Sequence, residues 1–361
     1  MKQSLKREIT QILHSSPIVE NLACKTFVSL FVMALIQLRK VQFNELATAL
    51  NEGAKVSSNQ NRIEDFFREV SINFEAVAHL IVALLPKQAK LRLTIDRTEW
   101  DFGKCQVNIL MVLIGCGDLQ LPLYWELLDN KSGNSSSQDR IDLLEKSFAI
   151  VPKERIGLVV SAREFVGHKL HFVMRIPKHH LLTTQQQQAF ALDELEIPLG
   201  KTRCFVNCLV DGCSGNVWIK RLTQTEYLYL FGTVEVSYLG QLYRKRWCIE
   251  SFFQNLKGRG YDLESTHLRS LEKLSKLVAL VSLAHAFCMS VGLYCHKKVQ
   301  AIKSKKHGYK ANSFARYGLN QLRALRRGEL QQEAVLWPLL KRVFDWLKRQ
   351  LAQNQKTILA E

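Results

Sequence analysis

The sequence predicts an α/β protein: a mixed β-sheet core with a β-rich insertion, between helical N-terminal and C-terminal regions. Residues 1–85 carry apolar side chains at helical spacing, and from residue 91 the pattern changes to short apolar runs that are typical of strands. Helical patterns return after residue 238. With 361 residues, 47 % of them hydrophobic, the chain can bury one large core or several smaller ones, and this composition excludes wholesale disorder.

The charge of the chain predicts a polyanionic partner. The formal net charge is +17, and residues 297–361 alone hold 15 Lys and Arg against 4 Asp and Glu. Such a balance is typical of proteins that bind nucleic acid or an anionic membrane surface.

The cysteines and the N-terminus predict a cytoplasmic protein with reduced thiols. The chain begins MKQSLKREITQILHSS, without a signal-peptide pattern, and its nine cysteines are scattered. Cys204, Cys208 and Cys213 lie close together, but their spacing is not that of paired zinc ligands. A zinc site and ordinary strand thiols both remain open for these three residues.

One segment is apolar enough to span a membrane. Residues 277–295 contain no Asp, Glu, Lys or Arg, and 19 residues are enough for a spanning helix. Ser282, His285 and Ser290 interrupt the segment, and no second span of this kind exists. A fully buried helix of a soluble domain explains the pattern equally well.

The N-terminal region is predicted to contain two short helices around a turn. Apolar residues recur at helical spacing over 43–50, Gly53 can end that helix, and Ser57 or Ser58 can cap the next one. Together with the basic charge, this pattern favours a DNA-contacting helix-turn-helix. An ordinary helical hairpin is the alternative.

The core is predicted from the order of its elements. Residues 91–100, 105–116 and 119–128 read as three antiparallel strands, followed by a helix over 141–150 and a short strand over 155–160. This order is that of a ribonuclease-H-like mixed sheet. Residues 170–237 are strand-like again, except that 179–196 is predicted as a loop with a short helical turn.

A helix over 243–257 is predicted to carry a lone carboxylate among basic and aromatic residues. At about 100° per residue, one narrow face carries Tyr243, Arg246, Glu250 and Lys257. Apolar residues point the other way, toward a core. One interpretation of Glu250 is a surface pair with Arg246, worth about 0.3–0.5 kcal/mol. The other is a catalytic acid, which would need partners from other segments.

Asp96 is the candidate partner of Glu250. It lies in the middle of the first predicted strand, between apolar residues, where a carboxylate is unfavourable unless it has a function or a partner. The alternative is an aspartate that is neutralised by a neighbouring arginine such as Arg97 or Arg140.

The pattern Tyr243-x2-Arg246-x3-Glu250-x6-Lys257 resembles the Tyr-Arg-Glu-Lys signature of bacterial insertion-sequence transposases of the DDE, cut-and-paste kind. Further similarity lies in four segments, at 94–100 (TIDRTEW), 121–144, 161–167 (SAREFVG) and 313–319 (SFARYGL). The resemblance extends over about residues 20 to 330.

The resemblance implies a site and a chemistry. Three acids of this family hold two divalent ions, Mg²⁺ or Mn²⁺, for attack on DNA phosphates, and Asp96 and Glu250 match the first and third acids. Tyr243, Arg246 and Lys257 would bind phosphates near the transposon end. Trp247 either stacks on an unpaired base or packs in the core. The implied partners are terminal inverted repeats, target DNA and a second copy of the chain, in the bacterial cytoplasm at the nucleoid.

The chain departs from the family pattern at the second acid. Ala162 stands where an Asp is expected, and a methyl group cannot ligate a metal. Glu164 or Asp211 could substitute, although neither matches the motif, and the segment after Phe165 is shorter than usual. We therefore expect a transposase without cleavage activity. The alternatives are a retained DNA-binding regulator and a nuclease or resolvase on the same core.

The resemblance also assigns roles to the predicted regions. These are a DNA-end-binding helical domain at 1–88, a catalytic core at 89–169 and 238–298, the insertion at 170–237, and a basic helical C-terminal region at 299–361.

Overall fold

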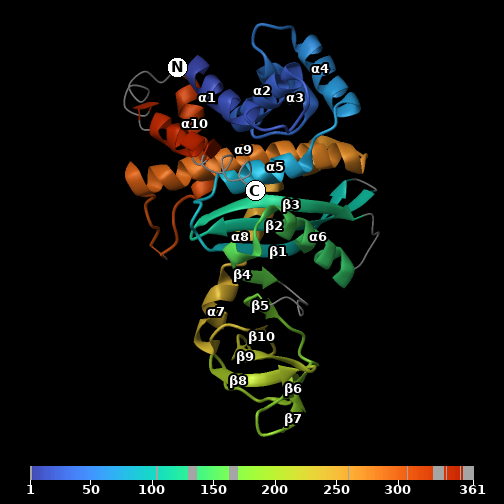
Figure 1. Cartoon of the computed structure of the whole chain (residues 1–361), viewed down its shortest axis with the longest axis vertical. Helices are drawn as coiled ribbons and strands as arrows, with labels where there is room; N and C mark the ends of the chain where they lie inside the picture. Colours follow the sequence, from blue (N-terminus) through green and yellow to red (C-terminus); the bar gives the residue numbers. More distant parts are fainter. Residues whose placement is uncertain are drawn as a thin grey trace.

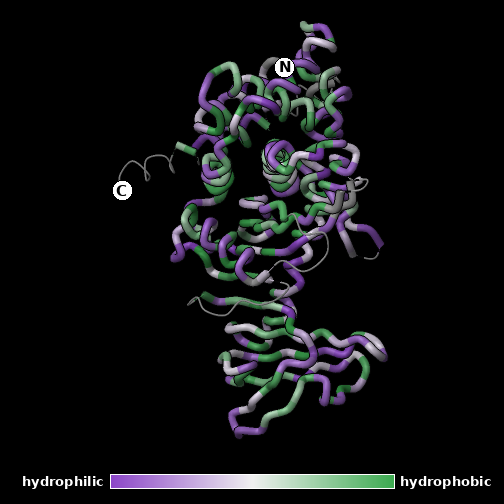
Figure 2. Tube along the Cα trace, turned by 90° about the vertical axis from the view of Figure 1, so that its right-hand side faces the viewer, coloured by the Kyte–Doolittle hydropathy of each residue, from purple (hydrophilic) through white to green (hydrophobic). Residues whose placement is uncertain are grey.

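The computed structural model describes residues 2–102, 105–128, 136–161, 170–258, 260–306, 308–327, 337–338, 340–349 and 351–352. Figure 1 shows an elongated molecule with helices at one end, a sheet in the middle and further strands at the other end. In the side view of Figure 2 the far strands form a narrow lobe below the sheet. The helical ends and the mixed α/β core agree with the prediction.

The N-terminal region is helical, as predicted. Its helices are α1 (Lys2–His14), α2 (Leu22–Leu38), α3 (Phe43–Leu50), α4 (Val56–Glu69) and α5 (Phe74–Ala83).

The predicted start of α4 was wrong. The helix begins at Val56 with Lys55 as its N-cap, so Ser57 and Ser58 lie inside the first turn and neither caps it. Packing against α3 explains this position. The buried Asn59 amide of α4 donates hydrogen bonds to the carbonyls of Ala47 and Asn51, at 2.9 and 3.0 Å, and so joins α4 to the end of α3. Tertiary contacts of this kind outweigh a local capping preference.

One mixed sheet contains all the strands of the described residues, in the order β3-β2-β1-β4-β5-β10-β9-β8-β6-β7. The core strands are β1 (Leu91–Phe102), β2 (Cys105–Cys116), β3 (Leu119–Leu128) and β4 (Ile156–Ser161). The first three are antiparallel neighbours, and β4 runs parallel to β1 on its other side. The predicted order of strands and helix is therefore observed.

The strands of the insertion continue this sheet. They are β5 (Phe172–Arg175), β6 (Leu181–Thr183), β7 (Ala189–Ala191), β8 (Thr202–Val210), β9 (Cys213–Arg221) and β10 (Tyr227–Gly232). Strand β5 pairs in parallel with β4, and β10 pairs with β5 in antiparallel register. The first strand of the insertion thus lies directly beside the core, and the last strand lies next to the first.

The prediction for residues 179–196 was wrong in part. The segment forms the β6–β7 hairpin, in which Gln187 adopts a positive φ of 61° at the turn. The short helical turn is present as a 3₁₀ turn at Leu192–Glu194. Strand β6 pairs with the edge of β8, and the local sequence does not reveal this contact with a later segment.

Four of the remaining helices pack against the sheet, namely α6 (Ser137–Ile150), α7 (Val236–Arg244), α8 (Trp247–Leu256) and α9 (Leu271–Lys298). Helix α10 (Phe314–Arg327) packs on α9 instead. In Figure 1, α9 crosses the molecule between the N-terminal helices and the sheet. It is long and apolar enough to cross a membrane, but 89 % of its apolar window is buried inside the protein. This burial is typical of a core helix.

Side chains from α9 connect both neighbouring layers. The buried Lys276 ammonium donates to the carbonyl of Phe67 at the end of α4, at 3.3 Å. On the sheet side, Ser275 accepts a hydrogen bond from the indole of Trp125 in β3, at 2.9 Å. The backbones of α9 and α10 are in direct contact at Gly292, because a Cβ on this residue would lie 1.8 Å from the Phe314 carbonyl oxygen.

Candidate active site

Asp96 lies at the centre of the sheet, in β1 between β2 and β4. Its side chain is only 15 % exposed, and one carboxylate oxygen accepts a hydrogen bond from the Arg97 amide at 2.9 Å. Burial raises the pKa of Asp96, and the positive charge of Arg246 opposes that effect. A carboxylate held this way in a central strand costs stability, which is common at functional sites.

The segment that carries Glu250 is two helices. The prediction of one continuous helix over 243–257 was wrong, because α7 ends at Arg244 and α8 begins at Trp247. Between them the backbone tightens: the amide of Lys245 bonds to the Leu242 carbonyl at 3.0 Å, and that of Arg246 to the Tyr243 carbonyl at 2.9 Å. These bonds span three residues instead of four, as in a 3₁₀ turn. Both residues keep right-handed dihedral angles, so the turn does not reverse the chain.

Arg246 connects the two candidate acids. One of its terminal nitrogens pairs with Asp96 of β1, and the other pairs with Glu250 on the next turn of α8. Asp96 and Glu250, 154 positions apart in sequence, therefore meet at one guanidinium. Burial would lower the pKa of Arg246, but the Asp96 carboxylate and its other neighbours outweigh that effect and raise it.

The other residues of the Tyr243–Lys257 pattern lie around the same group. The Arg246 guanidinium is 5.5 Å from the centre of the Tyr243 ring, within cation–π range. At the end of α8 the Lys257 ammonium donates to the Glu99 carbonyl of β1, at 2.9 Å. Burial raises the pKa of Tyr243, so its hydroxyl stays a hydrogen-bond donor at neutral pH.

Helix α8 is held by its apolar face, as the sequence predicts. Its buried side chains are Ile249, Phe252, Phe253 and Leu256. Trp247, by contrast, is 63 % exposed beside the candidate acids. This exposure argues against the core-packing interpretation of Trp247 and leaves its indole open to a ligand.

Ala162, Glu164 and the segment after Phe165 lie outside the described residues. The described part of β4 ends at Ser161, which pairs with Ile95, the residue before Asp96. The chain therefore leaves β4 next to the candidate site.

Asp211 is not in a position to complete this site. It lies in the β8–β9 turn with a positive φ of 47°, where it pairs with His180 and accepts a hydrogen bond from the Leu181 amide at 3.0 Å. Five strand spacings separate β8 from β1 in the sheet order, which corresponds to about 24 Å. The possible substitution of Asp211 for the second acid is therefore excluded by its position.

Two carboxylates on one cationic group fit part of a divalent-ion site. Asp96 and Glu250 offer oxygen ligands, which Mg²⁺ and Mn²⁺ prefer, and Arg246 lies where such an ion would balance their charge. No group of three or more His, Cys, Asp or Glu residues that could hold a metal occurs among the described residues. Cys204, Cys208 and Cys213 therefore do not form such a group.

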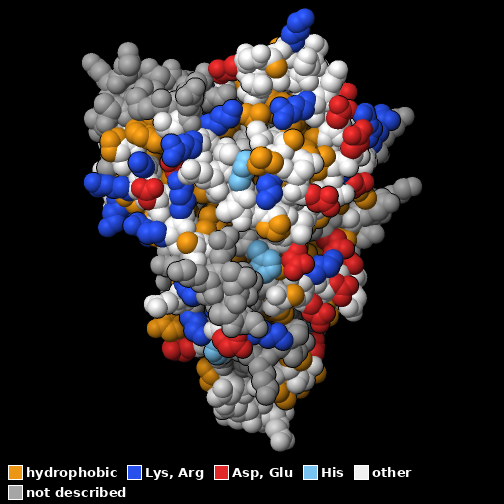
Figure 3. All heavy atoms as spheres, turned by 45° about the horizontal axis from the view of Figure 1, so that its top comes forward, with side chains coloured by type: hydrophobic (Ala, Val, Ile, Leu, Met, Phe, Trp, Pro, Cys, Tyr) orange, Lys and Arg blue, Asp and Glu red, His pale blue; other side chains and the backbone are white. Residues whose placement is uncertain are grey.

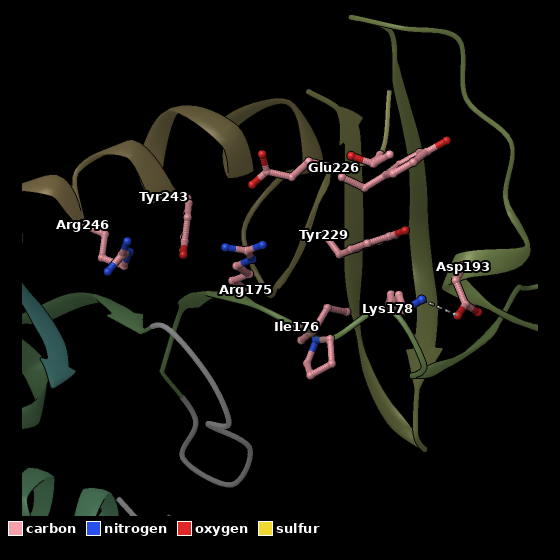
Figure 4. A pocket seen from close by; sticks show the side chains of 11 residues that line it. Arg175, Ile176, Lys178, Asp193, Glu226, Tyr229, Tyr243 and Arg246 are labelled. Carbon is pink, nitrogen blue, oxygen red and sulfur yellow. Dashed lines mark ion pairs between the residues drawn. The ribbon is translucent and has the colours of Figure 1, made fainter. Parts of the chain in front are cut away.

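A pocket of about 570 Å³ opens beside Arg246 and Tyr243, between α7 and the insertion. In the close view of Figure 4, Arg175 lies next to Tyr243, and Lys178 and Tyr229 extend the wall away from Arg246. Asp193 pairs with Lys178 at 3.7 Å. The rings of Tyr227 and Tyr229 are stacked, with their centres 5.8 Å apart.

Sequence reasoning missed these pocket residues. The signal that could have revealed the tyrosines is their alternation in EYLYLFG, which places Tyr227 and Tyr229 on one face of a strand. Arg175 and Lys178 carry no comparable signal, because their place in the pocket depends on the pairing of β5 with β10.

The comparisons with known proteins concern this same region. Residues 162–287 match the family model described as "Transposase DDE domain". The matched segment includes the insertion and the α7–α8 segment with Glu250, whereas β1 with Asp96 precedes it. No curated protein matches the chain.

Proposed function

Because residues 162–287 match the transposase DDE domain, we propose that this chain is a DDE transposase that binds the terminal inverted repeats of an insertion sequence through a site built for cut-and-paste transposition. The observation that carries the proposal is the meeting of Asp96 and Glu250 at Arg246. Acids from a central strand and from a later helix are what metal-dependent phosphoryl transfer requires.

Each residue of the site has a role in this proposal. Asp96 and Glu250 would hold divalent metal, Mg²⁺ or Mn²⁺, which would supply the activation of the attacking oxygen. Arg246, once free of the carboxylates, would bind a DNA phosphate together with Tyr243 and Lys257. The exposed indole of Trp247 stacks on an unpaired base.

The pocket beside the site supports a DNA ligand. Its wall combines the cationic Arg175 with the stacked Tyr227 and Tyr229 rings, while Lys178 in the same wall is paired with Asp193. Cations that bind phosphates and aromatic faces that stack on bases are the two components of single-strand binding.

We also propose that the chain as it stands does not cleave DNA, because Ala162 replaces the second acid. The test is Mg²⁺-dependent nicking of a cognate end. We expect none from the natural chain, and nicking from the Ala162→Asp variant. The matched control is Ala162→Asp with Glu250→Gln, which should be inactive although it also carries Asp at 162. Nicking by the natural chain would contradict the inactivity, and no recovery in Ala162→Asp would contradict the proposed site.

A second candidate function is favoured by the same alanine. The chain would act as a regulator that occupies transposon ends without cutting them. Binding to ends that is unchanged in EDTA, together with an inactive Ala162→Asp variant, would support this function.

The finer organisation follows the family pattern. We propose that residues 1–88 bind the DNA end, where the first turn of α4 exposes Lys55, Ser57 and Ser58, and that two chains act on paired ends in the bacterial cytoplasm. Light scattering on the chain with a cognate end tests the dimer: a complex with a single chain would contradict it.

A further inference from the structure

A loop closed by one β-bridge connects α9 to α10 and carries lysines on its surface. We call its described residues 303–306 and 308–311 the lysine hairpin; they lie in the loop that hangs from the C-terminal end of α9 in Figure 1. Ser304 and Lys310 form a bridge, and the Lys305 amide bonds to the Tyr309 carbonyl at 2.7 Å. Gly308, with a φ of 83°, supplies the left-handed residue of the turn. Main-chain bonds therefore give the hairpin a defined shape.

The base of the hairpin is fixed to both helices. The His296 ring of α9 accepts a hydrogen bond from the Ile302 amide at 2.8 Å and packs edge-on against Phe314 of α10. Tyr317 of α10 donates from its hydroxyl to the Gln300 carbonyl at 3.2 Å. These contacts fix the orientation of the hairpin relative to α9 and α10.

The sequence around the lysine hairpin carries positively charged side chains and no carboxylates. Residues 273–328 contain 12 Lys and Arg and no Asp or Glu. Six exposed lysines belong to the hairpin or to the end of α9, namely Lys297, Lys298, Lys303, Lys305, Lys306 and Lys310. Within the described residues none of the six forms an ion pair with a carboxylate. In Figure 3, Lys and Arg side chains gather at the left edge, where Figure 1 places this end of α9.

The lysine hairpin lies away from the candidate acids. Lys297 is close enough to Cys116 for its charge to oppose the burial that raises the pKa of that thiol. Cys116 follows Gly115, which pairs with Arg92, four residues before Asp96 in β1. Four residues of strand correspond to about 13 Å.

We infer that the lysine hairpin is a second DNA contact, separate from the candidate active site, which binds the phosphate backbone without reading sequence. The inference rests on the proposed function, which supplies DNA as the ligand. Lysines in a fixed array without carboxylate partners match the spaced charges of a duplex and release its counterions on binding.

The test compares two double variants with the same loss of charge in the full-length chain. One is Lys305→Gln with Lys306→Gln, at the turn of the hairpin. The other is Lys153→Gln with Lys201→Gln, two exposed lysines elsewhere on the surface. Both replace side chains only, so the main-chain bonds of the hairpin remain, and circular dichroism checks the fold. Binding to a cognate end and to an unrelated duplex is titrated at several salt concentrations.

We expect the salt dependence of DNA binding to change in the hairpin variant alone. The slope of log K against log salt should become shallower by about 0.9 for each lost phosphate contact, equally on both duplexes. The control pair should keep the natural slope. Equal slopes for the hairpin variant and the natural chain would overturn the inference, while a natural chain that binds neither duplex would overturn the proposed function itself.

A membrane surface is the competing partner for a lysine cluster. Sedimentation with vesicles of anionic phosphatidylserine separates the two. Lysine-dependent vesicle binding with unchanged DNA binding would overturn the inference.

Discussion

At the residue scale, Arg246 is the group on which the candidate site depends. One guanidinium balances two carboxylates that are only 15 % and 28 % exposed. A divalent cation that binds the same oxygens has to displace Arg246. Under the proposed function, metal binding would therefore be coupled to the release of Arg246 toward a phosphate.

The Arg246→Met variant should separate charge balance from metal binding. Without metal, two adjacent carboxylates lose their partner, and we expect the free energy of unfolding to fall by about 1–3 kcal/mol, less than for a fully buried pair. With Mg²⁺ the competing guanidinium is absent, so the rise in Tm on metal addition should exceed that of the natural chain. Thermal unfolding with and without Mg²⁺ measures both effects.

The control for this variant is Arg244→Met, because Arg244 is exposed on the preceding turn. It should leave the stability and the metal response unchanged. A smaller Mg²⁺ shift in Arg246→Met than in the natural chain would argue against a shared metal and arginine position.

The sequence could predict the residues of the site but not their pairing. Asp96 is identified by its cost in an apolar strand, and Glu250 by its isolation among cations. Helical periodicity indicates the contact between Arg246 and Glu250, four residues apart. The contact between Arg246 and Asp96 joins positions 150 apart, and it depends on how α8 packs on β1, which no local pattern encodes.

At the element scale, the apolar faces of the helices were easier to predict than their ends. The buried face of α8 follows from its spacing, whereas the break at Lys245 and Arg246 does not, because both residues are acceptable inside a helix. In the same way Ser57 looks like a cap, but Asn59 fixes α4 in another position. Element ends are decided by contacts with distant segments.

The crossing of α9 and α10 requires two glycines. A Cβ on Gly318 would lie 1.9 Å from the Cys288 carbonyl oxygen, as close an approach as at Gly292. We expect Gly292→Ala and Gly318→Ala each to destabilise the chain by about 2–3 kcal/mol, since backbone has to move. Urea unfolding measures the loss. Gly53→Ala is the control, because its nearest neighbour would be 3.8 Å away, and it should change stability by less than about 0.5 kcal/mol.

A buried histidine in α9 makes stability depend on pH. His285 packs against Phe252, and burial lowers its pKa from 6.5 to about 4. The folded chain therefore binds this proton less tightly than the unfolded chain. The stabilisation is complete above pH 6.5 and is lost as the pH falls toward 4.

Between pH 7 and pH 4.5 this single group should cost the natural chain about 2–3 kcal/mol, and His285→Gln should avoid that loss. Urea unfolding at the two pH values measures the difference. The matched control is His79→Gln, since the His79 side chain is 42 % exposed. An identical pH response of His285→Gln and the natural chain would show that His285 is not the titrating group.

At the scale of the whole molecule, net charge and DNA binding are connected. A chain with a formal charge of +17 and several basic surfaces should neutralise many phosphates at once. If 6–10 phosphates are contacted, the affinity for a cognate end should fall by about 10³-fold or more between 50 and 200 mM salt. Fluorescence anisotropy across that range measures the slope. A slope near zero would mean that the charge serves another partner.

The sheet that joins core and insertion also limits how the protein could be rebuilt. Because β5 is paired with β4 on one side and β10 on the other, the insertion is part of the same sheet as the core and is not a separate unit joined by two linkers. A graft of a foreign insertion would need to bring a matching final strand, or it would leave an open edge next to the acids. Amide protons of β10 should therefore exchange with deuterium as slowly as those of β1 and β4.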